Sequence, residues 1–314
     1  MNFPRYSMQT ESSQPVLVVG SVAFDQITTP TAESGRVLGG SATYASIAAS
    51  YQAPVNLVGV VGSDFGEEHL NRLRAHSIDL EGLQTDSSGP TFFWSGIYGE
   101  NFATRETTDT QLNVFEHFNP TLPETYRATP YILLGNIHPA LQHLVLDQIS
   151  GQPFVAADTM NLWIDISLDE LNRLLPRLDL FVLNDDESKM LTDESNVILA
   201  GRRLMEMGPK IVVIKKGEHG SILFHPDGLF AYPAYPVTRV EDPTGAGDSY
   251  LGALVGYLAS QDRTDSAALK KAILYATATA SLTVESFSCD RLEQAGRDAI
   301  EGRYQELLQL AAVH

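Results

Sequence analysis

The chain has 314 residues, of which 43% are hydrophobic and 19% are charged, with a mean hydropathy of -0.08. This composition is typical of a globular protein and excludes a largely disordered chain, and the length favours one large α/β domain or a core with an insertion. The formal net charge is -18. Because phosphate backbones are bound through Lys and Arg, we expect no nucleic-acid partner, and any anionic ligand needs a local site.

Cysteine content and the N-terminal segment bear on the cellular compartment. A single cysteine, Cys289, excludes an internal disulfide and a multi-cysteine metal site, and it suits a reducing compartment. Residues 1–14 are polar and lack the apolar run of a signal peptide, and no stretch approaches ~18 uninterrupted apolar residues. We therefore expect a cytoplasmic protein without a membrane partner. The eight histidines show no spacing typical of a metal site.

Short apolar runs alternate along the chain with longer segments that suit helices. The runs that predict buried strands are 16–20, 55–61, 131–135, 153–158, 179–183 and 210–215. The segments between them that predict helices are 42–51, 65–76, 140–150, 168–176 and 197–207. A hairpin around Pro226, Asp227 and Gly228 follows, and then helices at about 246–259, 266–283 and 290–312. This rhythm predicts a doubly wound α/β fold, with a mostly parallel central sheet and helices on both faces.

Two segments break the rhythm. Residues 92–115 carry aromatic and β-branched residues among many polar ones, which indicates a twisted β-ribbon, and residues 27–38 form a shorter, turn-rich excursion. We expect both to form a small β-lid over the sheet, since Phe92, Trp94 and Tyr98 would otherwise stay in water. A homodimer contact through the lid is an equally good cover for these side chains.

The segment most informative about chemistry is Glu241-Asp242-Pro243-Thr244-Gly245-Ala246-Gly247-Asp248, which leads into an apolar helix. Free backbone N–H groups at a helix N-terminus and the helix dipole allow Gly245, Ala246 and Gly247 to hold a phosphoryl group. Asp248, in the first turn, is placed to take a proton from an attacking hydroxyl. The alternative is a plain turn with an ordinary acidic residue. Neither a G-x-x-x-x-G-K-[ST] loop nor a G-x-G-x-x-G fingerprint occurs, which argues against P-loop proteins and dinucleotide-dependent oxidoreductases.

Five segments resemble motifs of the PfkB family of carbohydrate kinases, also called ribokinase-like kinases, and along the chain they follow the order of the motifs in that family. They are DPTGAGDSYLGALVGYL at 242–258, VLGGSATYASIAAS at 37–50, LVGVVGSDFGEEHLNRLRAHSID at 57–79, NDDE at 184–187 and VVIKKGEHGSILF at 212–224. The resemblance covers nearly the whole chain. It implies one kinase domain over residues 1–314, with a lid from about 27–38 and 91–116.

The resemblance implies transfer of the γ-phosphoryl group of ATP to a hydroxyl of a small substrate. Asp248 would be the catalytic base, and residues Gly245, Ala246 and Gly247 the anion hole. Glu187 and Asn184 resemble the pair that organises Mg²⁺ through water, although a helix cap is the plainer interpretation. Asp242 and Thr244 match positions that hold a monovalent cation such as K⁺ in some relatives. The remaining residues that match the ATP side are Lys215, Gly217, Gly220, Ala276 and Ala280.

The acceptor should bind where Asp25, Gly39 and Gly40 lie, near the carboxyl end of the first strand or the start of a helix. A carboxylate can accept hydrogen bonds from vicinal hydroxyls, and glycines let a sugar approach the backbone. Many sugar kinases of the family have Asn four residues after the second glycine, but this chain has Tyr44 there. Tyr44 would stack on a ring, donate through its hydroxyl, or pack under the lid. Further candidates for contact with the acceptor are Ser41, Arg105, Asn136, His138, Asp158 and Asn161.

The sequence leaves the acceptor open. We expect a sugar or sugar derivative, and the alternative is a nucleoside, which Tyr44 and the aromatic ribbon would suit. A third alternative is a catalytically silent protein that binds sugars or nucleotides with the same fold. Arg105 in the ribbon would bind a substrate phosphate or carboxylate, or remain a solvated charge.

Overall fold

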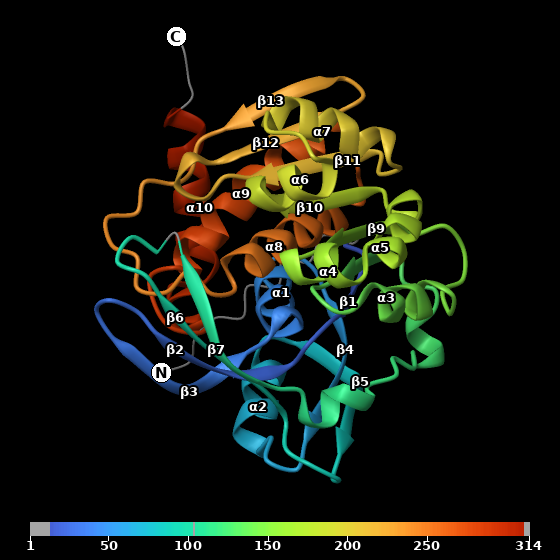
Figure 1. The fold of residues 1–314 in the computed structure, drawn as a ribbon, viewed down its shortest axis with the longest axis vertical. Helices are drawn as coiled ribbons and strands as arrows, with labels where there is room; N and C mark the ends of the chain where they lie inside the picture. Colours follow the sequence, from blue (N-terminus) through green and yellow to red (C-terminus); the bar gives the residue numbers. More distant parts are fainter. Residues whose placement is uncertain (1–12, 103, 311–314) are drawn as a thin grey trace.

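The computed structural model describes residues 13–102 and 104–310, and within them most strands belong to one central sheet (Figure 1). The strand order of this nine-stranded sheet is β13-β12-β11-β10-β9-β8-β1-β4-β5. In chain order the bounds are β1 Val16–Val19, β4 Val55–Gly62, β5 Ile78–Asp86, β8 Tyr131–Leu134, β9 Phe154–Asp158, β10 Leu180–Asn184, β11 Ile211–Lys215, β12 Ser221–His225 and β13 Gly228–Tyr232. The pairs from β5 across to β11 are parallel, and β12 and β13 are added antiparallel. The carboxyl ends of seven parallel strands therefore meet at one edge.

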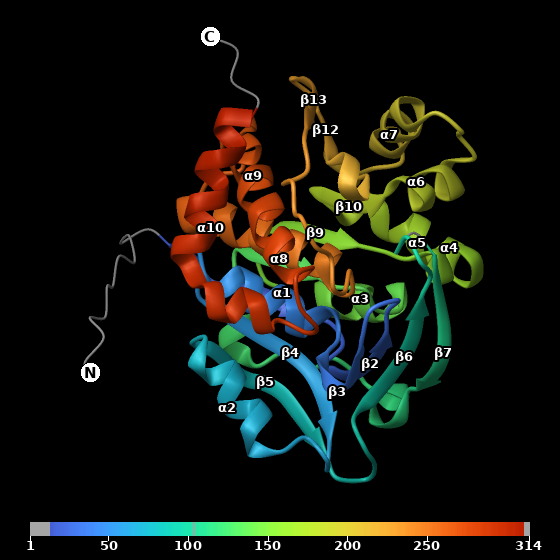
Figure 2. The same ribbon diagram turned by 90° about the vertical axis from the view of Figure 1, so that its left-hand side faces the viewer.

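Helices cover both faces of this sheet, as Figure 2 shows. One face carries α1 Ser41–Ser50, α2 Glu67–Ala75, α8 Ala246–Gln261, α9 Ser266–Thr283 and α10 Asp290–Leu310. The other carries α3 Pro139–Leu146, α4 Asn161–Ile166, α5 Leu168–Leu174, α6 Asp185–Thr192 and α7 Val197–Glu206. Alternate residues of β1 serve the two cores, with Val16 and Val18 on the first face and Leu17 and Val19 on the second. Burial on both faces explains why this strand is entirely apolar.

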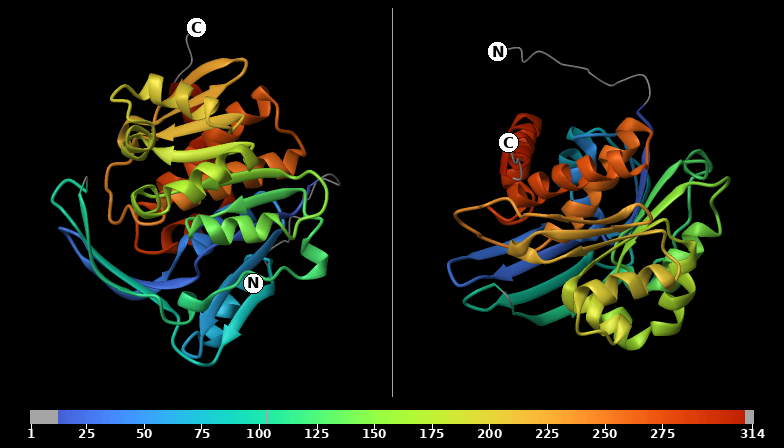
Figure 3. Two further views of the ribbon diagram at one scale, coloured as in Figure 1. Left: turned by 45° about the vertical axis from the view of Figure 1, so that its right-hand side comes forward. Right: turned by 90° about the horizontal axis from the view of Figure 1, so that it is seen from above.

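A second sheet of four strands, the small sheet, lies beside the carboxyl edge of the central sheet. Its order is β3-β2-β6-β7, with bounds β2 Ala23–Thr28, β3 Glu33–Gly39, β6 Phe92–Tyr98 and β7 Arg105–Gln111. Figure 3 shows β6 and β7 as a curved ribbon that extends from the body of the molecule. Both segments that break the sequence rhythm thus become strands, and β2 begins earlier than the predicted lid, at Ala23.

The six predicted core strands are confirmed, and so is the predicted hairpin, which β12 and β13 form. Helix α9 has its predicted bounds. Three expectations were wrong in detail. The helix predicted over 140–150 ends at Leu146, and the one over 168–176 ends at Leu174 in a 3₁₀ turn, Leu175–Arg177, that contains Pro176. The last helix contains a non-helical Gly296, and its predicted residues 311–312 lie outside the described residues. Strand β5 and helices α4 and α6 were not predicted.

Candidate active site

The carboxyl ends of three adjacent strands bring Asp158, Asn184 and Lys215 to one edge of the sheet. In the parallel register Val182 pairs with Asp158 and Asn184 pairs with Lys215. Asp158 is 5% exposed, and its Oδ1 atom has no hydrogen-bond partner among the described residues. Burial raises the pKa of Asp158 well above its ordinary value, the nearby Asp248 adds to this, and the Lys215 charge opposes it. This edge therefore holds a buried polar group that lacks a protein partner.

Helix α8 begins at the same edge, directly after a left-handed turn. Gly245 has φ +73°, and a Cβ built on it would lie 2.3 Å from Cδ1 of Tyr44. The N–H of Ala246 donates to the carbonyl of Pro243 at 3.2 Å, so this group belongs to the turn. Among the described residues we find no protein acceptor for the N–H groups of Gly245 and Gly247. These two groups, at the positive end of the helix, are free to bind an anion.

Asp248 stands in the first turn of α8, directly after Gly247, which lies close to the side chain of Lys215 at the end of β11. The Nζ atom of Lys215 would lie 2.7 Å from a Cβ built on Gly247. Burial raises the pKa of Asp248, while the charges of Lys215 and Arg105 oppose this rise. A buried carboxylate with a raised pKa is a stronger base than an exposed one, which suits it to accept a proton.

Asp25 belongs to strand β2 of the small sheet and not to the end of the first strand. It is 4% exposed, and a Cβ on Gly39 of the neighbouring strand would lie 2.0 Å from its Oδ2 atom. Burial, together with the charges of Asp242 and Asp248, raises the pKa of Asp25 to about 7, and the N–H of Gly40 opposes this. Only glycine at position 39 leaves room for this carboxylate.

Asp242 and Thr244 shape the loop that leads into α8. The Oδ1 atom of Asp242 accepts a hydrogen bond from the N–H of Thr244 at 2.8 Å. The Oδ2 atom has no partner among the described residues, although Asp242 is 0% exposed. Burial raises the pKa of Asp242 to about 6. A buried carboxylate oxygen without a partner is a suitable ligand for a cation.

Asn184 and Glu187 form a capping box at the start of α6, so the plainer interpretation of this pair describes their geometry. The N–H of Glu187 donates to Oδ1 of Asn184 at 2.7 Å, and the N–H of Asn184 donates to Oε2 of Glu187 at 2.8 Å. Burial raises the pKa of Glu187, and the charge of Lys215 opposes the rise. The Oε1 atom has no protein partner in the described chain, which leaves it available to a water of a Mg²⁺ ion.

Some predicted acceptor contacts are taken up by the protein itself. The Oγ atoms of Ser41 and Ser21 lie 3.2 Å apart, and each accepts a hydrogen bond from the other residue's N–H. Trp163 donates to Oδ1 of Asn136 at 2.7 Å, and the Asn136 amide donates to the sulfur of Met160 at 3.2 Å. These contacts fix the β1–α1 and β8–α3 connections, and the roles of Ser41 and Asn136 in binding an acceptor stay predictions.

The other predicted residues lie at helix starts, in a turn or in the core. His138 caps α3 by accepting from Ala140 at 3.1 Å, and its Nε2 atom lies 3.0 Å from Oγ of Ser167. Asn161 is exposed at the start of α4. Gly217 and Gly220 form the turn between β11 and β12. Ala276 is 0% exposed and packs in the core, and Ala280 is half-buried.

Tyr44 is also a packing residue. It is 1% exposed, and its ring lies against Gly245. Its hydroxyl has no partner in the described residues, and burial raises its pKa, with the charges of Asp25 and Asp242 among the further causes. The ring is therefore covered and cannot stack on an acceptor in this conformation, so packing is the alternative that fits.

Tyr98 is a site residue that sequence reasoning placed only in the ribbon. Its hydroxyl lies 3.0 Å from Oγ1 of Thr244, which joins the small sheet to the loop before α8. Its cross-strand partner is Arg105, whose guanidinium carbon lies 5.3 Å from the ring centroid of Trp94. The alternation of aromatic residues along the ribbon signals that one face is covered, but it does not identify the residue that meets the loop.

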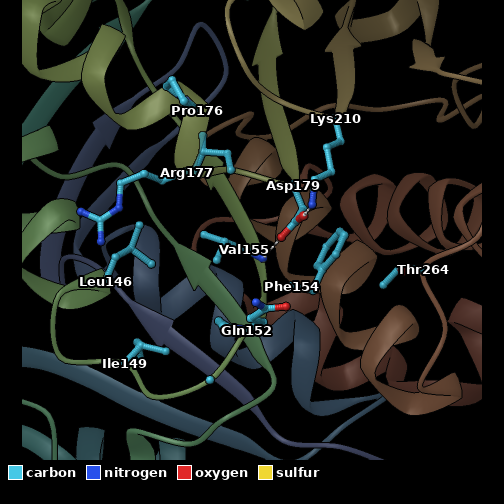
Figure 4. Close-up of a pocket in the computed structure, with 13 residues that line it drawn as sticks. Leu146, Ile149, Gln152, Phe154, Val155, Pro176, Arg177, Asp179, Lys210 and Thr264 are labelled. Carbon is cyan, nitrogen blue, oxygen red and sulfur yellow. Dashed lines mark hydrogen bonds and ion pairs between the residues drawn. The ribbon is translucent and has the colours of Figure 1, made fainter.

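A separate hollow of about 610 Å³ lies at the amino ends of β9, β10 and β11, away from these residues (Figure 4). The charged side chains that line it are already paired: Lys210 contacts Asp179 at 2.6 Å and Arg177 contacts Asp147 at 2.8 Å. Among residues 13–102 and 104–310 no cluster of three or more His, Cys, Asp or Glu could hold a metal ion. The helices within those ranges are all too short or too polar to cross a membrane.

Comparison with known proteins places this chain in a family. Cytidine kinase of Thermococcus kodakarensis is 30% identical over 79% of this chain and 88% of its own. Nucleoside kinase of Methanothermobacter thermautotrophicus is 29% identical over 86% and 89%. Aminoimidazole riboside kinase from Salmonella enterica, solved with aminoimidazole riboside and an ATP analogue, superposes with a TM-score of 0.74 at 18% identity over 92% of this chain and 99% of that chain. The fold is thus ribokinase-like. The family model described as pfkB family carbohydrate kinase matches residues 14–295, and the chain belongs to this family of kinases.

Proposed function

We propose that this kinase transfers the γ-phosphoryl group of ATP to a hydroxyl of a small sugar or sugar derivative. The observation that carries the proposal is the position of Asp248 in the first turn of α8, directly after the free N–H groups of Gly245 and Gly247. The start of α8 thus offers an anion site at Gly245 and Gly247 and a proton acceptor at Asp248. In phosphoryl transfer, such positioning and charge neutralisation supply most of the acceleration.

In the proposed reaction Asp248 orients the acceptor hydroxyl and takes its proton as the oxygen attacks the γ-phosphorus. The bond from that phosphorus to the bridging oxygen breaks, and ADP leaves. Lys215, packed against Gly247, offers a positive charge to the phosphate oxygens. Glu187 would hold Mg²⁺ through water, and the ion, when bound, neutralises phosphate oxygens. Asp242, with its unpartnered Oδ2 atom, would hold K⁺.

On the acceptor side, we propose that Asp25 receives hydrogen bonds from hydroxyls of the substrate. Gly39 and Gly40 would let the substrate approach the backbone closely. Gly40 has φ +91°, and a Cβ there would lie 2.5 Å from the carbonyl oxygen of Ser21. Gly217, Gly220 and Ala280 are proposed to border ATP. A nucleoside is the second candidate acceptor, because two relatives that align over most of their length are named cytidine kinase and nucleoside kinase.

A screen of sugars, sugar phosphates and nucleosides for acceptor-dependent ADP release tests the proposal. We expect one class of acceptor to release ADP in the presence of Mg-ATP and to give a phosphorylated product by mass spectrometry. Product with nucleosides alone would select the second candidate. No product with any acceptor, from a protein that binds Mg-ATP, would instead support a silent binding protein.

A further inference from the structure

Tyr98 connects the small sheet to the start of α8 through a short chain of hydrogen bonds. It stands at the end of β6 and is 8% exposed. Its hydroxyl lies 3.0 Å from Oγ1 of Thr244, and the N–H of Thr244 donates to Oδ1 of Asp242 at 2.8 Å. The ribbon of β6 and β7 is therefore tied by side chains to the loop that precedes Gly245.

Strand β7, opposite Tyr98, supplies a cation, Arg105, whose charge acts on carboxylates of the candidate active site. Arg105 begins β7 and pairs with Tyr98 across the ribbon. Its charge opposes the burial that raises the pKa values of Asp25, Asp248 and Glu187. Directly paired residues of an antiparallel ribbon place their side chains on the same face, so Arg105 shares the face from which Tyr98 contacts Thr244.

We propose that Tyr98 is a positioning residue: its hydroxyl fixes the β6–β7 ribbon to the loop at Thr244 and thereby holds Arg105 beside the phosphoryl group in transfer. The inference rests on the proposed function. The planar guanidinium offers several N–H donors to phosphoryl oxygens. Tyr98 itself needs no contact with either substrate.

The hydroxyl, and not the ring, carries this role. The ring contacts Phe102, with centroids 6.3 Å apart, and this packing survives removal of the oxygen. Burial raises the pKa of the Tyr98 hydroxyl, and the hydrogen bond to Thr244 and the charge of Arg105 oppose the rise. Tyr98→Phe therefore removes the link to the loop while leaving the ring and the strand pairing with Arg105 in place.

The test compares Tyr98→Phe with a matched hydroxyl deletion in the same strand. The hydroxyl of Ser95 also makes a hydrogen bond, with Thr108 at 2.7 Å. Both residues belong to the ribbon, so this bond does not connect the ribbon to the loop before α8. We expect Tyr98→Phe to lower kcat roughly 10-fold, the scale of one lost hydrogen bond. The Kd for Mg-ATP should stay within about 2-fold, and Ser95→Ala should change neither value beyond that range.

Arg105→Met is the second variant in the test, and it is measured alone and combined with Tyr98→Phe. If Tyr98 acts through Arg105, the double variant has the same kcat as Arg105→Met alone. Independent, multiplicative losses, or equal losses in Tyr98→Phe and Ser95→Ala, would overturn the proposal.

Hydrogen exchange separates this inference from the proposed function. A wild-type protein that phosphorylates no acceptor refutes the function, whatever the variants do. Amide exchange over residues 92–111 reports on the link alone. Faster exchange in Tyr98→Phe than in Ser95→Ala supports the link, and equal exchange rejects it.

Discussion

The ring of Tyr44 lies against Gly245, so that a Cβ built on this glycine would be 2.3 Å from Cδ1 of the ring. Gly245 also has φ +73°, a left-handed conformation that favours glycine. The steric contact and the dihedral angle both require glycine before α8. Tyr44 thus supports the turn that exposes the N–H groups of the anion site.

Gly245→Ala should therefore damage both stability and turnover. We expect a destabilisation of roughly 1–3 kcal/mol from backbone strain, with more from the Tyr44 contact, and a loss of phosphorylation of at least about 10-fold. Gly302→Ala is the control, since this exposed glycine of α10 has no atom within 4 Å of its built Cβ. Thermal unfolding and ADP release measure the two effects. Equal melting temperatures for the two variants would refute the steric argument.

Asp248→Asn tests the proposed base. The amide keeps the shape of the side chain but cannot take a proton, so we expect kcat to fall by at least ~100-fold. Folding and the Kd for Mg-ATP should be preserved. Asp169→Asn, in the first turn of α5, controls for loss of a carboxylate at a helix N-terminus and should be fully active. Near-normal turnover of Asp248→Asn would remove this residue from the role.

Lys215→Met should change the pH dependence of the reaction. Burial raises the pKa of Asp248 and the Lys215 charge opposes this, so removing the cation raises that pKa further. The base is then protonated at higher pH, and the acid limb of kcat/KM should move upward. The neighbouring Lys216→Met is the control. An acid limb at the same pH in wild type and Lys215→Met would show that this lysine does not act on the base.

The unpartnered oxygen of Asp242 predicts an effect of monovalent cations. Binding of K⁺ by the folded protein should raise the melting temperature above that in an equal concentration of a bulky organic cation. Asp242→Asn should abolish this difference, because the amide lacks the charge. A K⁺-dependent rise of the same size in the variant would place the ion elsewhere or show a general salt effect.

Much of the central fold is predictable because its strands are apolar on both faces. β1 and β10 read as continuous apolar runs, and glycines mark the start of α8. Strand β5 escaped prediction because it lies at the edge of the sheet, where only two of its nine residues are buried. The short helix α4 contains a single buried residue, so its pattern is weak.

The site was harder to predict because sequence gives no distances. Asp248 and Gly245 follow from local order alone, since both belong to one helix start. Ser41 carried no sign that Ser21 would occupy its hydroxyl, because the two lie 20 positions apart in sequence. Tyr98 meets Thr244 across 146 positions, a contact that only the folded small sheet creates.

Asp25 makes stability depend on pH in a direction opposite to that of most carboxylates. Burial raises the pKa of Asp25 to about 7, far above the value of about 3.9 expected for Asp in the unfolded chain. The folded state therefore binds the proton more tightly, and the stability it contributes is present below about pH 4 and is lost as the pH rises to 7.

Asp25→Asn removes this penalty and keeps an oxygen that can accept the N–H of Gly40. We expect the variant to match wild type near pH 4 and to exceed it by on the order of 2–4 kcal/mol at pH 8. Asp109→Asn, in an exposed position of the same sheet, controls for the loss of one negative charge. Denaturant unfolding at both pH values measures the difference. A gain for Asp25→Asn that is the same at pH 4 and pH 8, or that Asp109→Asn reproduces, would show that the buried carboxylate is not its source.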